Sequence, residues 1–536
     1  MNQSSFARRL RGGIWLIGAL LGLAACGGTA PSAAVPSSPD VFPSLNSSSK
    51  ASVPLETDAA PAQQPTPTLT STPNAARPTR ATASAPPAPT VTIRPSPVPT
   101  KATGVAVPPY YFGVNTYDEV LEQDHVRALA TSAGARMVRA IVKWDQIEKT
   151  QGEYDWSSTD AIFTTLTESN FTPLAMIVDN PKWIANTPCG PVKDRLAFDR
   201  FLHALVVRYP KIRYWMLYNE PDNSNYPRGH NGGCFGSDDL DGNGKPDYAD
   251  YAEHLKIAWR AIHRANPDAE LVSGALAFDN FDQASAPPGY PGGGQGGSFN
   301  AQFLANLVKY VQDNPPDPGA KYFDILAYNF YPIYGPYWER QAGGVGIGAK
   351  ANMLRNILRQ ANLPTRLLVS ETGANAFNNG VEEQSRYVTK TYVRGIASGL
   401  VAVVWWTFRD FPDSAAPPQN TWKYGLLDQN NSPKPAYAAY QTLAHKLTGA
   451  QYLDALSAQG SEGYLLSQDN AGLAVVWASG DTPVTIAFSG GALVLTDMYG
   501  AERQVLDNSP EDQDRAAGRI GVQVDGNPLY IQAANP

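Results

Sequence analysis

Short apolar runs alternate with longer stretches of helical periodicity between Pro109 and His445. The short runs are rich in β-branched and aromatic residues, which is typical of strands buried on both faces. Eight such runs are predicted as strands: 111–114, 137–142, 173–178, 214–218, 270–273, 323–329, 366–370 and 400–405. The stretches between them predict helices, among them 196–208, 248–265, 303–311 and 382–397. This order predicts parallel strands joined by right-handed helical crossovers.

The number of strand–helix units indicates the fold class. Eight units within about 340 residues favour an α/β fold, a (β/α)8 TIM barrel with enlarged loops, over an open doubly wound sheet. No Gly-x-Gly-x-x-Gly follows the first run, as a dinucleotide-binding sheet would require. In such a barrel the chemistry lies on the loops that follow the carboxyl ends of the strands.

The periodicity shortens to two from about residue 449. Alternating runs at 473–477, 484–488, 493–495 and 528–531 predict a small antiparallel β-sandwich over 449–536. The barrel then occupies 108–448. We expect the sandwich to buttress the barrel.

The N-terminus has the pattern of an export signal. Arg8, Arg9 and Arg11 precede an uncharged run, 12–25, which ends in Leu-Ala-Ala-Cys at 23–26. As a helix this run reaches about 21 Å, short of the roughly 30 Å hydrocarbon core, so a signal peptide is favoured over a transmembrane span. The motif resembles that of bacterial lipoproteins, which implies cleavage before Cys26 and a lipid on its sulfur. An ordinary cleaved signal is the alternative. Residues 1–26 therefore predict a protein outside the cytoplasm, lipid-anchored to the cell membrane or at the cell surface, by Sec or twin-Arg export.

A spacer follows the signal. Residues 27–107 are rich in Pro, Ser, Thr and Ala, with 16 Pro between Pro31 and Thr100 and Phe42 as the one aromatic residue. So little apolar surface cannot offset the entropy of ordering a chain. We expect a disordered linker spanning on the order of 50 Å.

Composition excludes several classes of function. The net charge of −7 argues against a nucleic-acid partner, because polyanion binding depends on clustered Lys and Arg. Three Cys exclude a disulfide scaffold and a Cys-rich zinc site. Charged residues are 17% of the chain, below the roughly 25% of ordinary domains, which agrees with a Pro-rich segment outside the fold.

Two of the predicted strands end in a glutamate. Run 214–218 continues as Asn219-Glu220-Pro221, and run 366–370 continues as Glu371-Thr372. Both side chains would lie at the same rim of the barrel. A facing pair of carboxyl groups can hydrolyse a glycosidic bond, one as proton donor to the leaving oxygen and the other as nucleophile.

These residues resemble the retaining glycoside hydrolases of clan A, families 39 and 5 most closely, over about residues 110–445. The resemblance implies that Glu220 is the acid/base, Glu371 the nucleophile, and Asn219 a contact of the sugar 2-hydroxyl. It also implies that Arg139, on run 137–142, lies beside the nucleophile. Retention requires carboxyl groups about 5 to 5.5 Å apart, whereas inversion requires more than about 6.5 Å.

Aromatic residues near the predicted rim extend the resemblance. Tyr331, after run 323–329, would donate a hydrogen bond to the nucleophile. Trp405 and Trp406 must point to opposite faces of their strand, and the resemblance places Trp406 in the site. Trp144 and Trp183 could stack on sugar rings, or could pack within their loops.

The sequence thus predicts a retaining glycoside hydrolase of β-glycosidase or endoglycanase type acting on oligo- or polysaccharide. Xylosides, glucosides, mannosides and galactosides all remain possible, as do endo and exo action. The alternative is a non-catalytic carbohydrate-binding or envelope protein on the same scaffold, because fold alone does not fix function. No cofactor is expected for catalysis, and we expect a monomer whose partners are carbohydrate and, through the lipid, a membrane.

An acidic loop before the predicted helix 248–265 resembles a calcium loop. Oxygen ligands occupy the spacing of an EF-hand-like loop with Gly at the sixth position, and Ca²⁺ prefers such oxygens. The candidate ligands are Asp239, Asp241, Asn243, Lys245 (through its carbonyl), Asp247 and Asp250. The last is Asp rather than Glu, which shortens the bidentate arm. A solvated Asp/Gly turn is the alternative.

Two cysteines remain. Cys189 follows the run 173–178 and Cys234 follows the run 214–218, so both belong to the rim. In a protein outside the cytoplasm they predict a disulfide, with two free thiols as the alternative.

Overall fold

The structure is a computed structural model. It describes residues 90–91, 106–117, 119–223, 234–237, 239, 242–277, 300, 302–332, 335–415, 419–456, 458–469 and 471–534. The signal peptide, Cys26 and nearly all of the predicted linker lie outside these residues.

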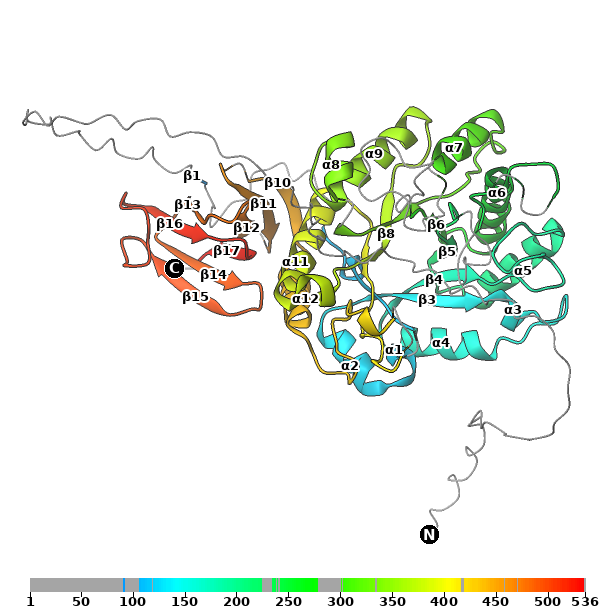
Figure 1. Cartoon of the computed structure of the whole chain (residues 1–536), viewed down its shortest axis with the longest axis horizontal. Coiled ribbons are helices and arrows are strands. Elements are labelled where there is room, and N and C mark those ends of the chain that lie inside the picture. The colour runs from blue at the N-terminus through cyan, green and yellow to red at the C-terminus, as the bar shows by residue number, and fades with distance from the viewer. Residues whose placement is uncertain are drawn as a thin grey trace, which may run out of the picture. The chain divides into compact units, whose positions relative to one another are not determined.

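Eight parallel strands form a barrel, as the sequence predicts (Figure 1). Their order in the sheet is β6-β5-β4-β3-β2-β9-β8-β7. The strands are β2 (Phe112–Asn115), β3 (Met137–Lys143), β4 (Thr172–Val178), β5 (Tyr214–Asn219), β6 (Glu270–Ala275), β7 (Leu326–Phe330), β8 (Leu367–Thr372) and β9 (Val403–Trp405). The two ends of the sheet meet through parallel bridges that pair Val272 with Ile325 and Leu276 with Tyr328. The β6–β7 seam therefore closes the barrel with less strand pairing than the other seams.

Helices connect the strands and surround them (Figure 1). The helices are α1 (Glu119–Glu122), α2 (Asp124–Ser132), α3 (Trp144–Ile147), α4 (Ser157–Glu168), α5 (Arg195–Arg208), α6 (Asp247–Ala265), α7 (Phe303–Asp313), α8 (Gly335–Ala342), α9 (Ile347–Gln360), α10 (Ala376–Asn379), α11 (Val381–Ala397) and α12 (Pro435–Leu447). Helix α5 begins where Asp194 caps it by accepting hydrogen bonds from the backbone N–H of Leu196 and Ala197. All four helices predicted above are present, with ends within two residues of the prediction.

Alternating side chains of the strands separate two apolar layers. In β5, Tyr214 and Met216 point into the barrel, whereas Trp215 and Leu217 pack toward the helices. The barrel interior is a packed core of residues from all around the sheet, as expected for eight strands. Because apolar side chains fill the interior, a site for chemistry is expected at the mouth of the barrel.

The C-terminal residues form two sheets. The larger has the order β10-β11-β12-β17-β14-β15, and the smaller has the order β1-β13-β16. Their strands are β1 (Thr90–Val91), β10 (Gln451–Ala455), β11 (Ser461–Gln468), β12 (Ala471–Ala478), β13 (Val484–Ser489), β14 (Ala492–Asp497), β15 (Glu502–Leu506), β16 (Arg519–Val524) and β17 (Leu529–Ala533). All pairs are antiparallel except β1 with β13, so the predicted β-sandwich is confirmed. Strand β1 belongs to the predicted linker, which thus contributes two residues to a sheet.

One face of β12 joins the barrel core. Ala474 and Val476 pack between the two sheets, whereas Leu473, Val475 and Trp477 belong to the same apolar cluster as the barrel helices. Arg394 of α11 also donates two hydrogen bonds, of 2.8 and 2.7 Å, to the carboxylate of Glu462 in β11. The sandwich and the barrel therefore share buried surface.

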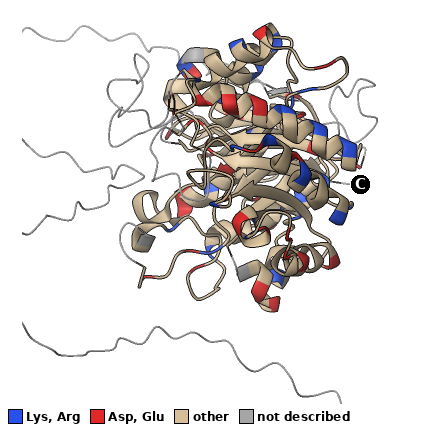
Figure 2. Ribbon diagram, turned by 90° about the vertical axis from the view of Figure 1, so that its right-hand side faces the viewer, with Lys and Arg blue, Asp and Glu red and all other residues tan. Residues whose placement is uncertain are grey.

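Acidic and basic side chains are interspersed along the helices (Figure 2). None of the helices in the described residues is long and apolar enough to cross a membrane.

Candidate active site

Glu371 lies at the mouth of the barrel within β8, which extends two residues beyond the predicted run 366–370. Arg139 of β3 forms an ion pair and hydrogen bond with its Oε1. The Tyr331 hydroxyl, directly after β7, donates to its Oε2 at 3.2 Å. Each carboxylate oxygen of Glu371 thus accepts a hydrogen bond from a different strand end. Burial and the neighbouring Glu371 raise the pKa of Tyr331 well above its usual value, which keeps that hydroxyl a donor.

Arg139 links Glu371 to the neighbouring strands. Its Nη1 donates to Asn219 Oδ1 at 3.3 Å and to Ser370 Oγ at 3.4 Å. The arginine is only 4% exposed, so these contacts rather than water hold its guanidinium. Residues of β3, β5 and β8 thereby meet at one cation.

Glu220 follows β5 and has a positive φ of 46°. Its backbone N–H donates to Ala275 O at 2.9 Å, and its Oε1 accepts a hydrogen bond of 2.9 Å from Asn329 Nδ2. Burial, and then the charge of Glu371, raise the pKa of Glu220 to about 8. Asp222 raises it further, whereas the bond from Asn329 lowers it. Glu220 is therefore suited to hold a proton near neutral pH.

The chain turns sharply before Glu220. Tyr218 has a φ of 62°, and its side chain packs in the helix-side cluster with its hydroxyl donating to Asn180 Oδ1 at 2.8 Å. This breaks the strict in–out alternation of β5, and the next side chain, Asn219, reaches Arg139. Left-handed backbone at a non-glycine residue is unfavourable, and it is often found where function requires a side chain to be re-aimed.

Two site residues, Asn329 and Lys350, are not among those that the sequence predicts. Asn329 joins both sides of the site, because its amide donates to Glu220 and its Oδ1 accepts from Ser370 Oγ at 2.9 Å. Lys350 of α9 is fully buried, and its Nζ donates to Ala277 O at 2.6 Å and to Asn329 O at 2.8 Å. It thus joins the two ends of the β6–β7 seam. A sequence signal existed for Lys350, which stands in the apolar stripe of α9 four residues before Leu354.

The two tryptophans at the end of β9 point in opposite directions. Trp405 packs against Tyr387 of α11, with its Nε1 donating to Tyr424 O at 2.9 Å. Trp406 packs edge to face on Tyr331, at 6.4 Å between ring centroids. Trp406 therefore lies beside the residue that contacts Glu371.

The other two tryptophans differ in exposure. Trp144 is 1% exposed, stacks on Phe201 of α5 at 4.5 Å between centroids, and donates from Nε1 to Glu148 at 2.7 Å. A ring covered in this way cannot stack on a sugar, so loop packing is the correct interpretation for Trp144. Trp183 is partly exposed and is held by a 2.8 Å hydrogen bond to the backbone of Glu148.

A disulfide joins the loops after β4 and β5. The sulfurs of Cys189 and Cys234 are bonded, and Cys234 N donates to Cys189 O at 3.0 Å. The second of these loops begins at Glu220, so the disulfide restrains the segment that carries it.

The acidic loop before α6 is only partly described, because Asp241 lies outside the described residues. Both carboxylate oxygens of Asp250 accept hydrogen bonds. Arg195 donates to Oδ1 at 2.9 Å, and Asn243 Nδ2 donates to Oδ2 at 2.9 Å. Asp239 accepts from Gly244 N at 3.0 Å, and Lys245 N donates to Asn243. No group of three His, Cys, Asp or Glu side chains in the described part of the chain is gathered for a metal. Carboxylate and amide oxygens are donors that suit Ca²⁺, but the candidate residues within the described part of the chain do not form a calcium site on their own. Asp247, the remaining candidate, is buried at the start of α6.

The fold and site together define a (β/α)8 barrel with a buried and a half-buried carboxyl group at its mouth. No protein-family model matches the chain, and no curated protein matches it. Solved structures do. A family 39 glycoside hydrolase from Bacteroides cellulosilyticus WH2 has a TM-score of 0.57 at 20% identity, covering 80% of this chain and 81% of that one.

Two further solved structures share the fold. A monomeric β-xylosidase from Caulobacter crescentus CB15 has a TM-score of 0.52 at 14% identity, covering 80% of this chain and 97% of that one. A family 30 endoxylanase from Clostridium papyrosolvens C71 has a TM-score of 0.52 at 13% identity, covering 83% and 100%. At these identities the likeness is one of fold.

Proposed function

We propose that this protein is a glycoside hydrolase that cleaves O-glycosidic bonds of oligo- or polysaccharide with retention of configuration. One observation carries the proposal: a buried glutamate with an arginine on its carboxylate and a half-buried glutamate with a pKa raised to about 8 lie at the barrel mouth, close enough for the charge of the first to raise the pKa of the second. Solved glycoside hydrolases of the same fold support it.

The reaction proceeds in two displacements. Glu371 attacks the anomeric carbon while the protonated Glu220 gives its proton to the leaving oxygen. In the second step water attacks the anomeric carbon of the glycosyl ester, the bond from that carbon to Glu371 breaks and frees its carboxylate, and Glu220 takes the water proton. The negative charge of Glu371 is one cause of the raised pKa of Glu220. Esterification removes this charge, so the pKa of Glu220 falls in the step that requires it to act as a base. Asn219 and Trp406 contact the sugar that is cleaved.

The test is a substrate screen with variants of each glutamate. The full-length protein is assayed on aryl β-xylosides, glucosides, mannosides and galactosides and on the corresponding polysaccharides. Glu371→Ala should abolish turnover, and Glu220→Ala should retain more activity on substrates with good leaving groups. Proton NMR should show the β-anomer first. Activity that survives Glu371→Ala would contradict the assignment, and an α-anomer first would replace retention by inversion. Carbohydrate binding without any hydrolysis would favour the non-catalytic alternative.

We also propose that the protein is exported and anchored by lipid on Cys26, on the strength of the Leu-Ala-Ala-Cys motif. The protein should partition into the membrane fraction of cells that express it. Cys26→Ser should release it from that fraction, and an unchanged distribution would contradict the anchor.

A further inference from the structure

A row of aromatic side chains leads outward beside the candidate active site. The row runs from Trp406 through Phe411 to Tyr117, with Trp422 packed beside its first two rings. Ring centroids are 6.0 Å apart from Trp406 to Phe411 and 5.4 Å from Phe411 to Tyr117, and the Trp422 centroid lies 5.7 Å from Trp406 and 5.5 Å from Phe411. Three of these residues belong to the loop between β9 and α12, and Tyr117 follows β2.

The row leads from the candidate nucleophile to solvent. At its inner end Trp406 is 6% exposed and packs on Tyr331, which donates to Glu371. Trp422 and Phe411 are partly buried, and Tyr117 at the outer end is 40% exposed. A cluster that served packing alone would be covered by other side chains, whereas this one becomes more exposed with distance from the site.

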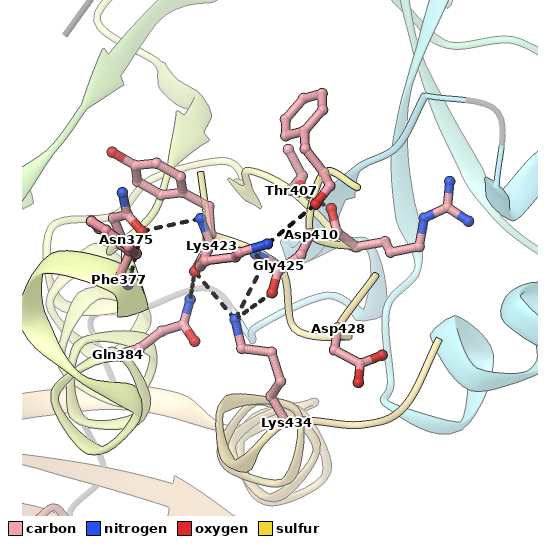
Figure 3. Close-up of polar contacts among 12 residues, drawn as sticks. Asn375, Phe377, Gln384, Thr407, Asp410, Lys423, Gly425, Asp428 and Lys434 are labelled. Carbon is pink, nitrogen blue, oxygen red and sulfur yellow. Dashed lines mark hydrogen bonds and ion pairs between the residues drawn. The ribbon is translucent and has the colours of Figure 1, made fainter. Parts of the chain in front are cut away.

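Polar contacts fix the conformation of the loop that carries the row (Figure 3). Lys434 donates to both carboxylate oxygens of Asp410 at 3.2 Å and to Lys423 O at 3.2 Å. Asp410 also accepts from Gly425 N at 2.7 Å. Asn375, after β8, accepts from Lys423 N at 3.1 Å. The pair of Asp410 and Lys434 is buried, so its loss would leave an unpaired charge inside the protein.

This buried network has a consequence for binding. Because the loop is fixed by its own contacts, its aromatic rings need little further ordering when a ligand arrives, which favours affinity. Polar groups lie alongside: the loop bears Asp413, which accepts from Lys423 Nζ at 2.5 Å and is exposed. Apolar rings with polar groups at their side suit a sugar, whose C–H face is apolar and whose hydroxyls lie at its rim.

We propose that the aromatic row binds sugar units next to the one that is cleaved, so that the substrate is an oligo- or polysaccharide chain rather than a single glycoside. The inference rests on the proposed function, because it takes Glu371 as the cleavage point. From Trp406 the row passes over Phe411 to the exposed ring of Tyr117, which allows an extended chain to follow it outward from the cleavage point.

Kinetics of outer-row variants test this. Tyr117→Ala and Phe411→Ala should lower kcat/KM on xylohexaose, cellohexaose or mannohexaose by about 10-fold, and should lower it much less on the matching aryl β-glycoside. Tyr499→Ala is the matched control, since Tyr499 lies in the sandwich and is 41% exposed. It should change neither. Equal losses on long and short substrates, or no loss on the hexasaccharide, would overturn the inference. If Phe411→Ala fails to fold, Tyr117→Ala carries the test.

Binding separates this inference from the proposed function. In a Glu371→Gln background, calorimetric titration with each hexasaccharide should give a Kd that Tyr117→Ala weakens about 10-fold and that Tyr499→Ala leaves unchanged. If the protein hydrolyses no substrate but binds a hexasaccharide with an affinity that depends on Tyr117, the proposed function is contradicted and sugar binding by the row is supported. If the protein hydrolyses aryl glycosides but binds none of the hexasaccharides, or binds them with an affinity that Tyr117→Ala does not change, sugar binding by the row is contradicted and the proposed function stands.

Discussion

The two glutamates of the candidate site carry the same group in different surroundings. Glu371 contacts the guanidinium of Arg139, whereas Glu220 accepts from the neutral amide of Asn329. Burial raises the pKa of Glu220 to about 8, and the nearby charge of Glu371 acts in the same direction. Glu220 is therefore suited to hold a proton near neutral pH, whereas Glu371 contacts a cation, which is the division of roles that glycoside hydrolysis requires.

This raised pKa predicts how stability changes with pH. An unfolded glutamate titrates near pH 4.3, so from about pH 4.5 to about pH 8 the native state keeps a proton on Glu220 that the unfolded state has released. Unfolding free energy therefore falls as pH rises through this window. Glu220→Gln removes the effect, so its stability relative to the wild type should increase by at least about 2 kcal/mol between about pH 5 and about pH 8. Urea unfolding at both pH values measures this, and a constant difference would contradict it.

Lys350 is predicted to act on Glu220 through Asn329. Lys350→Met removes the donor to Asn329 O and Ala277 O, which frees the backbone of β7 and weakens the amide bond to Glu220. That bond lowers the pKa of Glu220, so the alkaline limb of the kcat/KM profile should move to higher pH. Unsatisfied carbonyls should also lower the unfolding free energy by about 1 to 3 kcal/mol.

Two further variants serve as controls for the pH profile of Lys350→Met. Asn329→Ala removes the amide directly and should shift the alkaline limb in the same direction. Lys309→Met, on the exposed side of α7, should leave the profile unchanged. A Lys350→Met protein that is less stable but has a wild-type pH profile would show a structural role only.

At the scale of the element, the carboxyl ends of the strands hold the site and the long loops support it. The disulfide between Cys189 and Cys234 closes a loop of 45 residues, which restrains the unfolded chain by up to about 4 kcal/mol. Cys189→Ser with Cys234→Ser should lower the unfolding free energy by up to that amount. Reductant should lower the melting temperature of the wild type but not of the double variant. Equal sensitivity of both proteins would show that no disulfide contributes.

The acidic loop before α6 gives a second prediction for an element. Asp250 is held by Arg195 and Asn243, so we expect calcium to bind weakly, with a dissociation constant of about 1 mM. Melting temperature should rise at millimolar Ca²⁺, and Asp241→Ala should abolish the rise. A rise at micromolar Ca²⁺ would show a more complete site than the described residues form, and no rise at 10-fold above about 1 mM would exclude one.

Elements were predictable because their periodicity is local. Strand β5 and helix α5 follow directly from runs of apolar residues, and Glu220 and Glu371 follow from the ends of such runs. The contacts of Asn329 were not predictable, because they depend on how β7 lies against β5 and β8 around the barrel. Trp144 could not be assigned either, since only the packing of α5 shows that Phe201 covers its ring.

At the scale of the whole molecule, the barrel and the sandwich share one apolar cluster. Strand β12 divides its side chains between the sandwich core and the barrel helices, so neither unit buries all its apolar surface alone. Arg394 of α11 lies over the Trp477 ring at 5.6 Å and pairs with Glu462. The sandwich is therefore packed on the barrel as part of one folded structure rather than carried as a tethered module.

This shared cluster predicts one cooperative unfolding transition for both parts. Calorimetry of the full-length protein should show a single peak in which barrel and sandwich melt together. Trp477→Ala empties a site that is 1% exposed and should lower the unfolding free energy by about 3 to 5 kcal/mol, with the sandwich melting as a separate, earlier peak. Ile486→Ala, within the sandwich core, should lower stability without splitting the peak. Two peaks in the wild type, or a barrel melting temperature that Trp477→Ala leaves unchanged, would show that the two parts fold independently.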